Sequence, residues 1–368
     1  MGSRRTTILI CAAGAGLSVW MACNLLLPGA WRGRNDFLGF YAGATLVGAP
    51  NLYDRESVRG VQLRAAGESG EVQYGRLPCY ALFLKPLSWL PYDTAAAVWE
   101  ILLAAVFAGF VSLWPGVAAS TRWRICCWSL PAFACIFNGQ DDVILLLWMA
   151  ISARLLRAGW AGAAGAVLTL IASKFHLFLF VPLVILAQRR WRMAAGGAAG
   201  MGVLLAISFL AAGVGWPWQF YEVLRDSRIS TALDHMPNLH SLLTGTGALG
   251  LPLQTIAALA LAAGVFLSAR QAKSFEAALG VALAAGVLVG FHGYLHDGSL
   301  LLPALMAFSS VAERFARIPA MVLITPVPWF LLQLSRPLPA VTQLLIVWLA
   351  VAGMVYLRRN RRPEPKLI

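Results

Sequence analysis

The feature that most constrains this chain is a series of about twelve apolar runs, separated by short polar turns that contain most of its charges. A helix of about twenty apolar residues crosses roughly 30 Å of hydrocarbon. Only 12% of the residues are charged, whereas a soluble domain has roughly 25%. The sequence therefore predicts an all-α integral membrane protein, a polytopic bundle of about 12 transmembrane helices. The expected spans lie near 7–27, 94–114, 123–137, 142–153, 160–173, 176–187, 193–213, 251–269, 275–291, 298–311, 318–333 and 340–357.

Basic residues indicate the orientation of these spans. If the N-terminus is cytoplasmic, the even number of crossings puts every basic cluster on the cytoplasmic side, as the positive-inside rule requires. These clusters lie at 4–5, 122–124, 154–157, 189–192, 270–273, 314–317 and 358–366. We therefore expect both termini in the cytoplasm, an uncleaved signal anchor at the start and a basic tail over 358–368. The same loops account for the net charge of +13, so no nucleic-acid partner is expected.

One region, residues 160–187, is long enough for a single helix, but it contains Lys174 and His176. A break there keeps the flanking arginines on one side. It leaves two helical pieces of roughly 21 Å and 18 Å, too short to span the bilayer. Two other outer turns, 138–142 and 292–297, also follow short helices. Irregular backbone at membrane depth occurs where it is buried in protein or lines a watery cavity, so these three turns predict a cavity that opens outward.

The longest polar stretch, residues 28–93, is predicted to be a large first extracytoplasmic loop that covers this cavity. Residues 214–250 are predicted to form a second large extracytoplasmic loop. Apolar spacing over 36–46, and the prolines that bound 77–90, predict short interfacial helices, and Asp54 fits a helix N-cap. No repeat or linker divides the chain, so residues 1–368 are expected to form one domain. The six cysteines have no CxxC spacing, which argues against a disulfide framework or a cysteine-ligated metal.

Several short motifs occur in an order that resembles a known family. They are Asp36-Phe37, Tyr41-Ala42-Gly43, Leu52-Tyr53-Asp54, Pro78, Leu84-Lys85-Pro86-Leu87, Leu90-Pro91, Ala97-Val98-Trp99, Asn138-Gly139-Gln140, Lys174 and Arg189-Arg190-Trp191. The order is similar to that of glycosyltransferase family 87, most closely from about residue 35 to 195. The chain departs from the family pattern at Phe175-His176, where proline often follows the lysine, and at Asp141-Asp142, where a neutral residue is common.

The resemblance implies a fold of the C superfamily of glycosyltransferases, a polyprenyl-phosphate sugar donor with mannose as the sugar, and a lipid or glycan acceptor. The enzyme would lie in the inner (plasma) membrane, with its active site on the extracytoplasmic side. The motif position of the general base is Asp36, which would take the proton of the acceptor hydroxyl as its oxygen attacks the anomeric carbon and inverts it. The leaving phosphate requires cations or hydrogen-bond donors, and the candidates are Lys174, His292, His296 and Arg76. The candidates that line the substrate cavity are Tyr41, Gln140, Asp141, His176, His240 and Asp297.

Other interpretations of the two central residues stay open. Asp36 follows the arginines of residues 32–34 and could form an ordinary ion pair within the loop. Lys174 lies in an apolar context, where an ionisable side chain is a functional candidate by default. It could nevertheless pair with Asp141 or Asp142 instead of binding phosphate.

The sequence predicts no metal ligand and no cofactor, although a metal requirement stays open. His292 and His296 lie four residues apart, a spacing that can bind a metal on a helix. Gly293 argues against a regular helix there, and no third ligand is evident. No nucleotide-binding motif occurs, which favours a lipid-linked donor. The alternative functions are a transporter or lipid-linked-sugar flippase with an outward-open polar cavity, and a non-catalytic subunit of an envelope complex.

Overall fold

The computed structural model describes residues 2–26, 35–67, 72–226 and 233–360, and these residues form helices and no strands. Five helices or helix groups are long and apolar enough to cross a membrane. They are Arg5–Leu26, α5 (Tyr92–Leu113), α11 (Trp191–Ala212), Leu239–Gln271 with α14 (Gly250–Gln271), and α19 (Pro339–Arg359). A sixth span is possible if α7 (Leu130–Phe137) and α8 (Asp142–Arg157), which meet at a bend of 118°, cross as one unit. The all-helical prediction is confirmed for these residues, while twelve crossings stays a prediction.

Shorter helices complete the structure. The first loop contains α2 (Phe37–Leu46), α3 (Arg55–Ala66), α4 (Pro78–Leu84) and the 3₁₀ helix η3 (Lys85–Trp89). The others are α6 (Ala119–Cys127), α9 (Ala161–Leu168), η4 (Thr169–Leu177), α10 (Val181–Ala187), α12 (Trp216–Arg225), α13 (Leu239–Leu243), α15 (Phe275–Val289), η8 (Leu295–Leu301), α16 (Leu302–Phe308), α17 (Arg314–Ile324) and α18 (Pro326–Leu331). The N-terminal helix α1 (Gly2–Met21) continues into a short π-helical turn, Ala22–Leu26.

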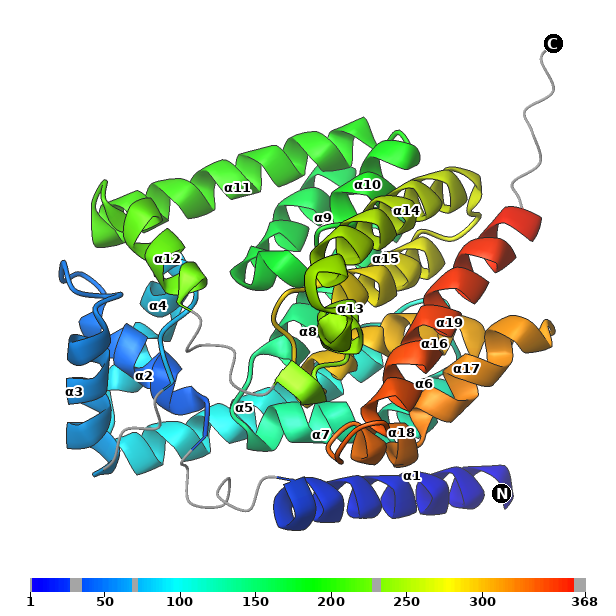
Figure 1. Ribbon diagram of the computed structural model, residues 1–368, viewed down its shortest axis with the longest axis horizontal. Helices are drawn as coiled ribbons and strands as arrows, with labels where there is room; N and C mark the ends of the chain where they lie inside the picture. Colours follow the sequence, from blue (N-terminus) through cyan, green and yellow to red (C-terminus); the bar gives the residue numbers. More distant parts are fainter. Residues whose placement is uncertain (1, 27–34, 68–71, 227–232, 361–368) are drawn as a thin grey trace.

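The long helices α1, α5 and α11 run along a common direction (Figure 1). At one end of them lie α2, α3, α4 and α12, which belong to the two predicted outer loops. At the other end α1 begins and α19 ends. The two terminal helices therefore have their chain ends on the same side, opposite the first loop. The loop before residue 35 and the basic tail after residue 360 lie outside the described residues.

The first loop packs onto the N-terminal end of α5. Phe37 in α2 stacks on Trp99 and Tyr92 of α5, with ring centroids 5.5 and 6.0 Å apart. The predicted helices at 36–46 and 77–90 are confirmed as α2 and as α4 with η3. Asp54 caps α3, as predicted, by accepting a 2.8 Å hydrogen bond from the backbone nitrogen of Ser57, and hydrogen bonds from Ser57 lower the pKa of Asp54.

Two predicted spans are interrupted. The prediction of one helix over 123–137 is wrong, because α6 ends at Cys127 and α7 begins at Leu130. Ser129 caps α7 by accepting from the nitrogen of Ala132, and Pro131 in the first turn has no N–H to donate. Residues 318–333 are likewise divided between α17 and α18, at an extended residue before Pro326. The predicted break near 174–176 is confirmed.

Candidate active site

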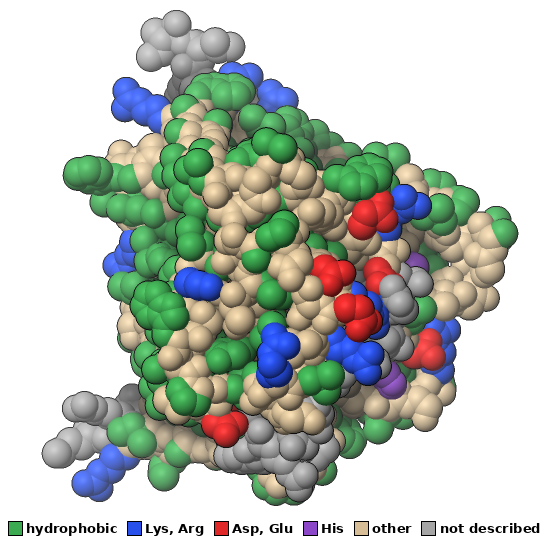
Figure 2. All heavy atoms as spheres, turned by 90° about the vertical axis from the view of Figure 1, so that its left-hand side faces the viewer, with side chains coloured by type: hydrophobic (Ala, Val, Ile, Leu, Met, Phe, Trp, Pro, Cys, Tyr) green, Lys and Arg blue, Asp and Glu red, His purple; other side chains and the backbone are tan. Residues whose placement is uncertain are grey.

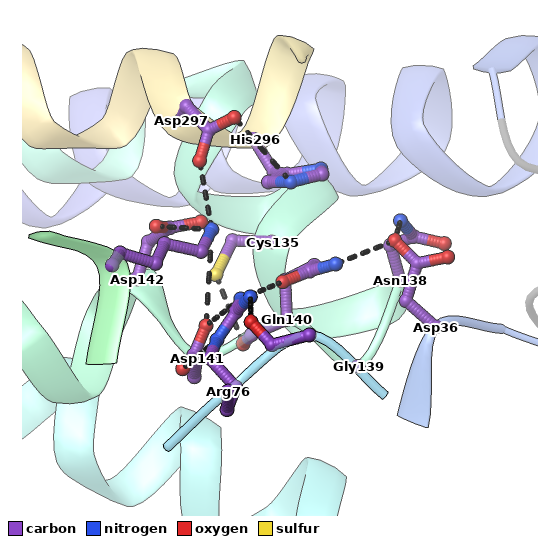
Figure 3. Close-up of polar contacts among 12 residues, drawn as sticks. Asp36, Arg76, Cys135, Asn138, Gly139, Gln140, Asp141, Asp142, His296 and Asp297 are labelled. Carbon is purple, nitrogen blue, oxygen red and sulfur yellow. Dashed lines mark hydrogen bonds and ion pairs between the residues drawn. The ribbon is translucent and has the colours of Figure 1, made fainter. Parts of the chain in front are cut away.

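Three irregular segments of the bundle and the first loop meet at one polar cluster (Figure 3). The first is the break between α7 and α8, where residues 138–141 belong to neither helix. The second is η4, in which Lys174 has non-helical backbone angles of φ −120° and ψ 46°. The third is η8, which begins after Tyr294. The first loop contributes Asp36, one residue before α2, and Arg76, shortly before α4.

Asp36 is held on the turn after α7 by its backbone and its side chain. The carboxylate oxygen Oδ2 accepts hydrogen bonds from Asn138 Nδ2 and Gln140 Nε2, each 2.6 Å long. The backbone nitrogen of Asp36 donates to the carbonyl oxygen of Asn138 at 3.0 Å. Hydrogen bonds to a charged acceptor are roughly twice as strong as neutral ones, so they fix the carboxylate in one position. Among the described residues, none donates to its other oxygen, Oδ1.

Gly139 allows the loop to approach the turn this closely. Its φ of +67° favours glycine, and a Cβ built there would lie 2.7 Å from Phe37 Cβ and 2.9 Å from Asn35 Oδ1. Its carbonyl oxygen accepts a 2.8 Å hydrogen bond from Trp99 Nε1. The turn therefore joins the N-terminal part of α5 to the residues on either side of Asp36.

Arg76 is a partly buried cation of the first loop, with a side chain that is 12% exposed. It donates to both carboxylate oxygens of Asp141, at 3.2 and 2.9 Å, and to Gln140 Oε1 at 3.3 Å. Its guanidinium also lies 5.2 Å from the ring centroid of Phe40. Burial disfavours the charge, but the Asp141 carboxylate outweighs that effect and raises the pKa of Arg76. Gln140 lies between Arg76 and Asp36 and bonds to both (Figure 3).

Lys174 is surrounded by three aspartates. Its Nζ lies 2.7 Å from Asp142 Oδ1, 2.7 Å from Asp297 Oδ1 and 3.7 Å from Asp141 Oδ1, and its side chain is 4% exposed. Of the two alternatives for this lysine, phosphate binding and an ion pair with Asp141 or Asp142, the structure contains the ion pair, and Asp142 is the closer partner. Asp297, assigned from the sequence to the substrate cavity, is an equal partner. The second oxygen of Asp142 is buried, and no described residue forms a hydrogen bond with it.

Three histidines and a tyrosine lie beside this cluster. The rings of His176 and His292 are 6.4 Å apart, those of His292 and Tyr294 4.7 Å, and those of Tyr294 and His296 5.9 Å. His296 Nε2 lies 3.7 Å from Asp297 Oδ2. Burial lowers the pKa of His292, although the Asp297 carboxylate opposes this effect. The structure thus brings together the histidines predicted from two separate turns.

One group in the described part of the chain has the arrangement of a metal site. Asp142, His296 and Asp297 place their ligand atoms within 4.8 Å of one another. The sequence suggested His292 and His296 as a possible metal-binding pair without a third ligand. In the structure His296 is grouped with two carboxylates, and His292 is not one of the three residues. Lys174 already contacts two of these carboxylates, so a cation side chain is present where such an ion would bind.

Two predicted cavity residues have other contacts. Tyr41 donates from its hydroxyl to the carbonyl oxygen of Leu90 at 2.9 Å and packs edge-on against Tyr92. His240 Nδ1 lies 3.2 Å from Gln254 Oε1. No described contact joins either side chain to the aspartates around Lys174.

Sequence reasoning missed two contributors to the site. Asn138 belongs to a quoted motif but was not assigned a role, although it holds Asp36. Asn35 donates to Phe137 O at 3.1 Å and to Glu100 Oε1 at 3.3 Å. Glu100 is an acidic residue within an apolar span, and such a residue indicates that a polar partner lies nearby. The arginines of residues 32–34 lie outside the described residues, and so does the alternative ion pair for Asp36.

Comparison with known proteins identifies the family. The family model for glycosyltransferase family 87 matches residues 78–303, more than half of the 368 residues. This match includes the 138–142 turn, Lys174 and the 292–297 turn, and begins after Asp36 and Arg76. No curated protein and no solved structure matches the chain. With its apolar helices, the chain is a membrane protein, and it belongs to glycosyltransferase family 87.

Proposed function

We propose that this glycosyltransferase moves a sugar, with mannose as the first candidate, from a polyprenyl-phosphate donor to a lipid or glycan acceptor. The reaction takes place on the extracytoplasmic face of the inner membrane, with both termini in the cytoplasm. The grouping of the first loop with α12, opposite the start of α1 and the end of α19, supports this orientation (Figure 1). So does the concentration of basic residues in the predicted cytoplasmic loops.

The observation that carries this proposal is the position of the Asp36 carboxylate. Oδ2 is held by two amide donors, each at 2.6 Å, and Oδ1 receives no hydrogen bond from a described residue. A general base needs one fixed carboxylate with an oxygen that can accept the proton. The acceptor hydroxyl attacks the anomeric carbon, its proton passes to Asp36, and the bond from that carbon to the phosphate oxygen breaks. One such displacement inverts the anomeric centre.

The leaving phosphate is proposed to lie near His292 and His296. Arg76 and Lys174 are already bound to carboxylates at 2.7–3.2 Å, so either would have to give up a strong partner to reach a phosphate. Their direct role in phosphate binding therefore stays a prediction. Because the carboxylates of Asp141, Asp142 and Asp297 balance these two cations, the proposal assigns the hydrogen bonds to the leaving phosphate to the two histidines.

The test uses purified protein in nanodiscs, a radiolabelled polyprenyl-phosphate mannose and a lipid extract of the host. Wild type is compared with Asp36→Asn, and with Asp93→Asn as the control, because Asp93 is an exposed carboxylate at the start of α5. We expect transfer in wild type and Asp93→Asn, and its loss in Asp36→Asn at unchanged thermal stability. Transfer that survives in Asp36→Asn would overturn the assignment of the base. No transfer from any polyprenyl-phosphate sugar tested would overturn the donor class.

A further inference from the structure

A polar groove of about 700 Å³ lies between the first loop and α12. One wall contains Tyr53, Arg55 and Gln73, and the other contains Trp218 and Glu222. Both walls belong to the face that Figure 2 shows, where acidic and basic side chains gather beside one another. Small-molecule sites typically have volumes of roughly 300–1,000 Å³, so the groove is large enough for a ligand and is separate from the cluster around Lys174.

The side chains of the groove fit an uncharged, polyhydroxylated ligand. The lining includes three acidic residues and two arginines, so its formal charge does not favour a phosphate or another anion. Gln73 and Gln219 add amides that donate and accept hydrogen bonds. Trp218 is 66% exposed and lines the same groove. An exposed aromatic face packs against the apolar C–H face of a sugar ring, while carboxylates and amides bond to its hydroxyls.

The two walls are fixed relative to each other. Arg55 Nη1 in α3 lies 3.1 Å from Asp226 Oδ2, just after α12. Tyr53 also packs against Phe220 of α12, with ring centroids 5.6 Å apart. Gln73 donates to the carbonyl oxygen of Tyr53 at 3.0 Å. The groove therefore has a defined width within the described residues.

The groove wall that contains Tyr53 is also connected to the candidate active site. The hydroxyl of Tyr53 donates to the carbonyl oxygen of Arg76 at 2.8 Å, and the side chain of Arg76 bonds to Gln140, which holds Asp36. Phe220, in the same helix as Trp218 and Glu222, packs against Phe175 with ring centroids 6.4 Å apart. A ligand in the groove is thus one layer of side chains away from residues of the site.

From these observations we propose that the groove between the first loop and α12 binds neutral sugar residues of the acceptor, with Trp218 as their stacking platform. This inference rests on the proposed function and specifies its acceptor: a glycan or glycolipid with at least one sugar beyond the residue that reacts. Trp218 is a binding residue here and has no part in the displacement at Asp36.

The first experiment measures transfer kinetics in nanodiscs with the acceptor purified from the host lipid extract. Trp218→Ala is compared with Trp218→Tyr and with Trp160→Ala, a matched control that is 67% exposed and precedes α9. We expect Trp218→Ala to raise the KM for the acceptor about 10-fold, with kcat and the donor KM unchanged. Trp218→Tyr should restore most of the affinity, and Trp160→Ala should behave as wild type. An unchanged acceptor KM in Trp218→Ala would overturn the proposal.

The second experiment needs no transfer activity. Saturation-transfer NMR, without donor, tests disaccharide methyl glycosides of mannose, galactose, glucose and arabinose. We expect a signal from at least one of them in wild type and Trp160→Ala, and its loss in Trp218→Ala. Equal signals in both alanine variants, or no signal from any sugar, would overturn the groove as a sugar site. A wild-type protein that binds a disaccharide but transfers no label would instead refute only the proposed donor.

Discussion

Replacing Lys174 by methionine removes the cation from a buried cluster of carboxylates while keeping most of the side-chain volume. Asp142 and Asp297 then each lose an ion pair of 2.7 Å. Breaking a buried pair by removing one partner costs about 3–5 kcal/mol, because the remaining charge stays buried. Unfolding entropies of about 2.1 cal/mol/K per residue convert this to a Tm about 4–6 °C lower for 368 residues.

The assay is thermal unfolding in detergent, followed by the loss of the monodisperse peak in size-exclusion chromatography. Lys85→Met is the matched control, because among the described residues Lys85 donates only to the carbonyl oxygen of Thr45 near the surface. This variant should shift Tm by less than about 1 °C. Lys174→Met combined with Asp142→Asn should recover at least half of the loss, since one unpaired carboxylate becomes neutral. A single variant as stable as wild type, or a double variant less stable than the single one, would refute this reasoning.

Three further predictions concern the same site. Gly139→Ala places a methyl group 2.7 Å from Phe37 Cβ at a positive φ. We therefore expect the free energy of unfolding to fall by about 2–5 kcal/mol, measured by thermal unfolding, and a wild-type Tm would contradict this. Gln140→Leu removes a hydrogen bond to the Asp36 carboxylate, and kcat should fall about 10–100-fold, measured by label transfer; an unchanged kcat would argue against Asp36 as the base. Burial lowers the pKa of His292 below 6.5, so the unfolded chain binds a proton at this residue more readily than the folded protein does. The free energy of unfolding is therefore unaffected by this residue above pH 6.5 and falls as the pH drops below it. His292→Gln should therefore flatten the decline of Tm below pH 6.5, and parallel curves would contradict this.

Local signals in the sequence were sufficient for the elements that surround the site. The break at Lys174 follows from the length of the apolar run and the basic residues that flank it. The cap at Asp54 is a property of a few neighbouring residues. The interruption between α6 and α7 was missed although its signal is also local, namely Ser129 two residues before Pro131. The interruption was missed because residues 123–137 are apolar enough to be interpreted as one continuous span.

Contacts across the fold could not be predicted in the same way. The sequence separation between Lys174 and Asp297 is 123 residues, and nothing near either residue identifies the other as its partner. Asp141 and Asp142 were equally good partners by sequence. Both lie within 4 Å of Lys174 Nζ, but Asp142 is closer, at 2.7 Å against 3.7 Å, and Asp141 hydrogen-bonds to Arg76. Such choices depend on how helices pack in three dimensions, whereas spans and breaks depend on composition.

The attachment of the first loop to the α7–α8 turn has a consequence for comparing and engineering enzymes of this kind. Asp36 is bound by Asn138 and Gln140, and a side chain at position 139 would collide with Phe37 and Asn35. Residues 35–37 and 138–140 therefore form one structural unit, held together by hydrogen bonds and close packing. A chimaera that exchanges the first loop between two homologues should retain activity only when this turn comes from the same parent as the loop.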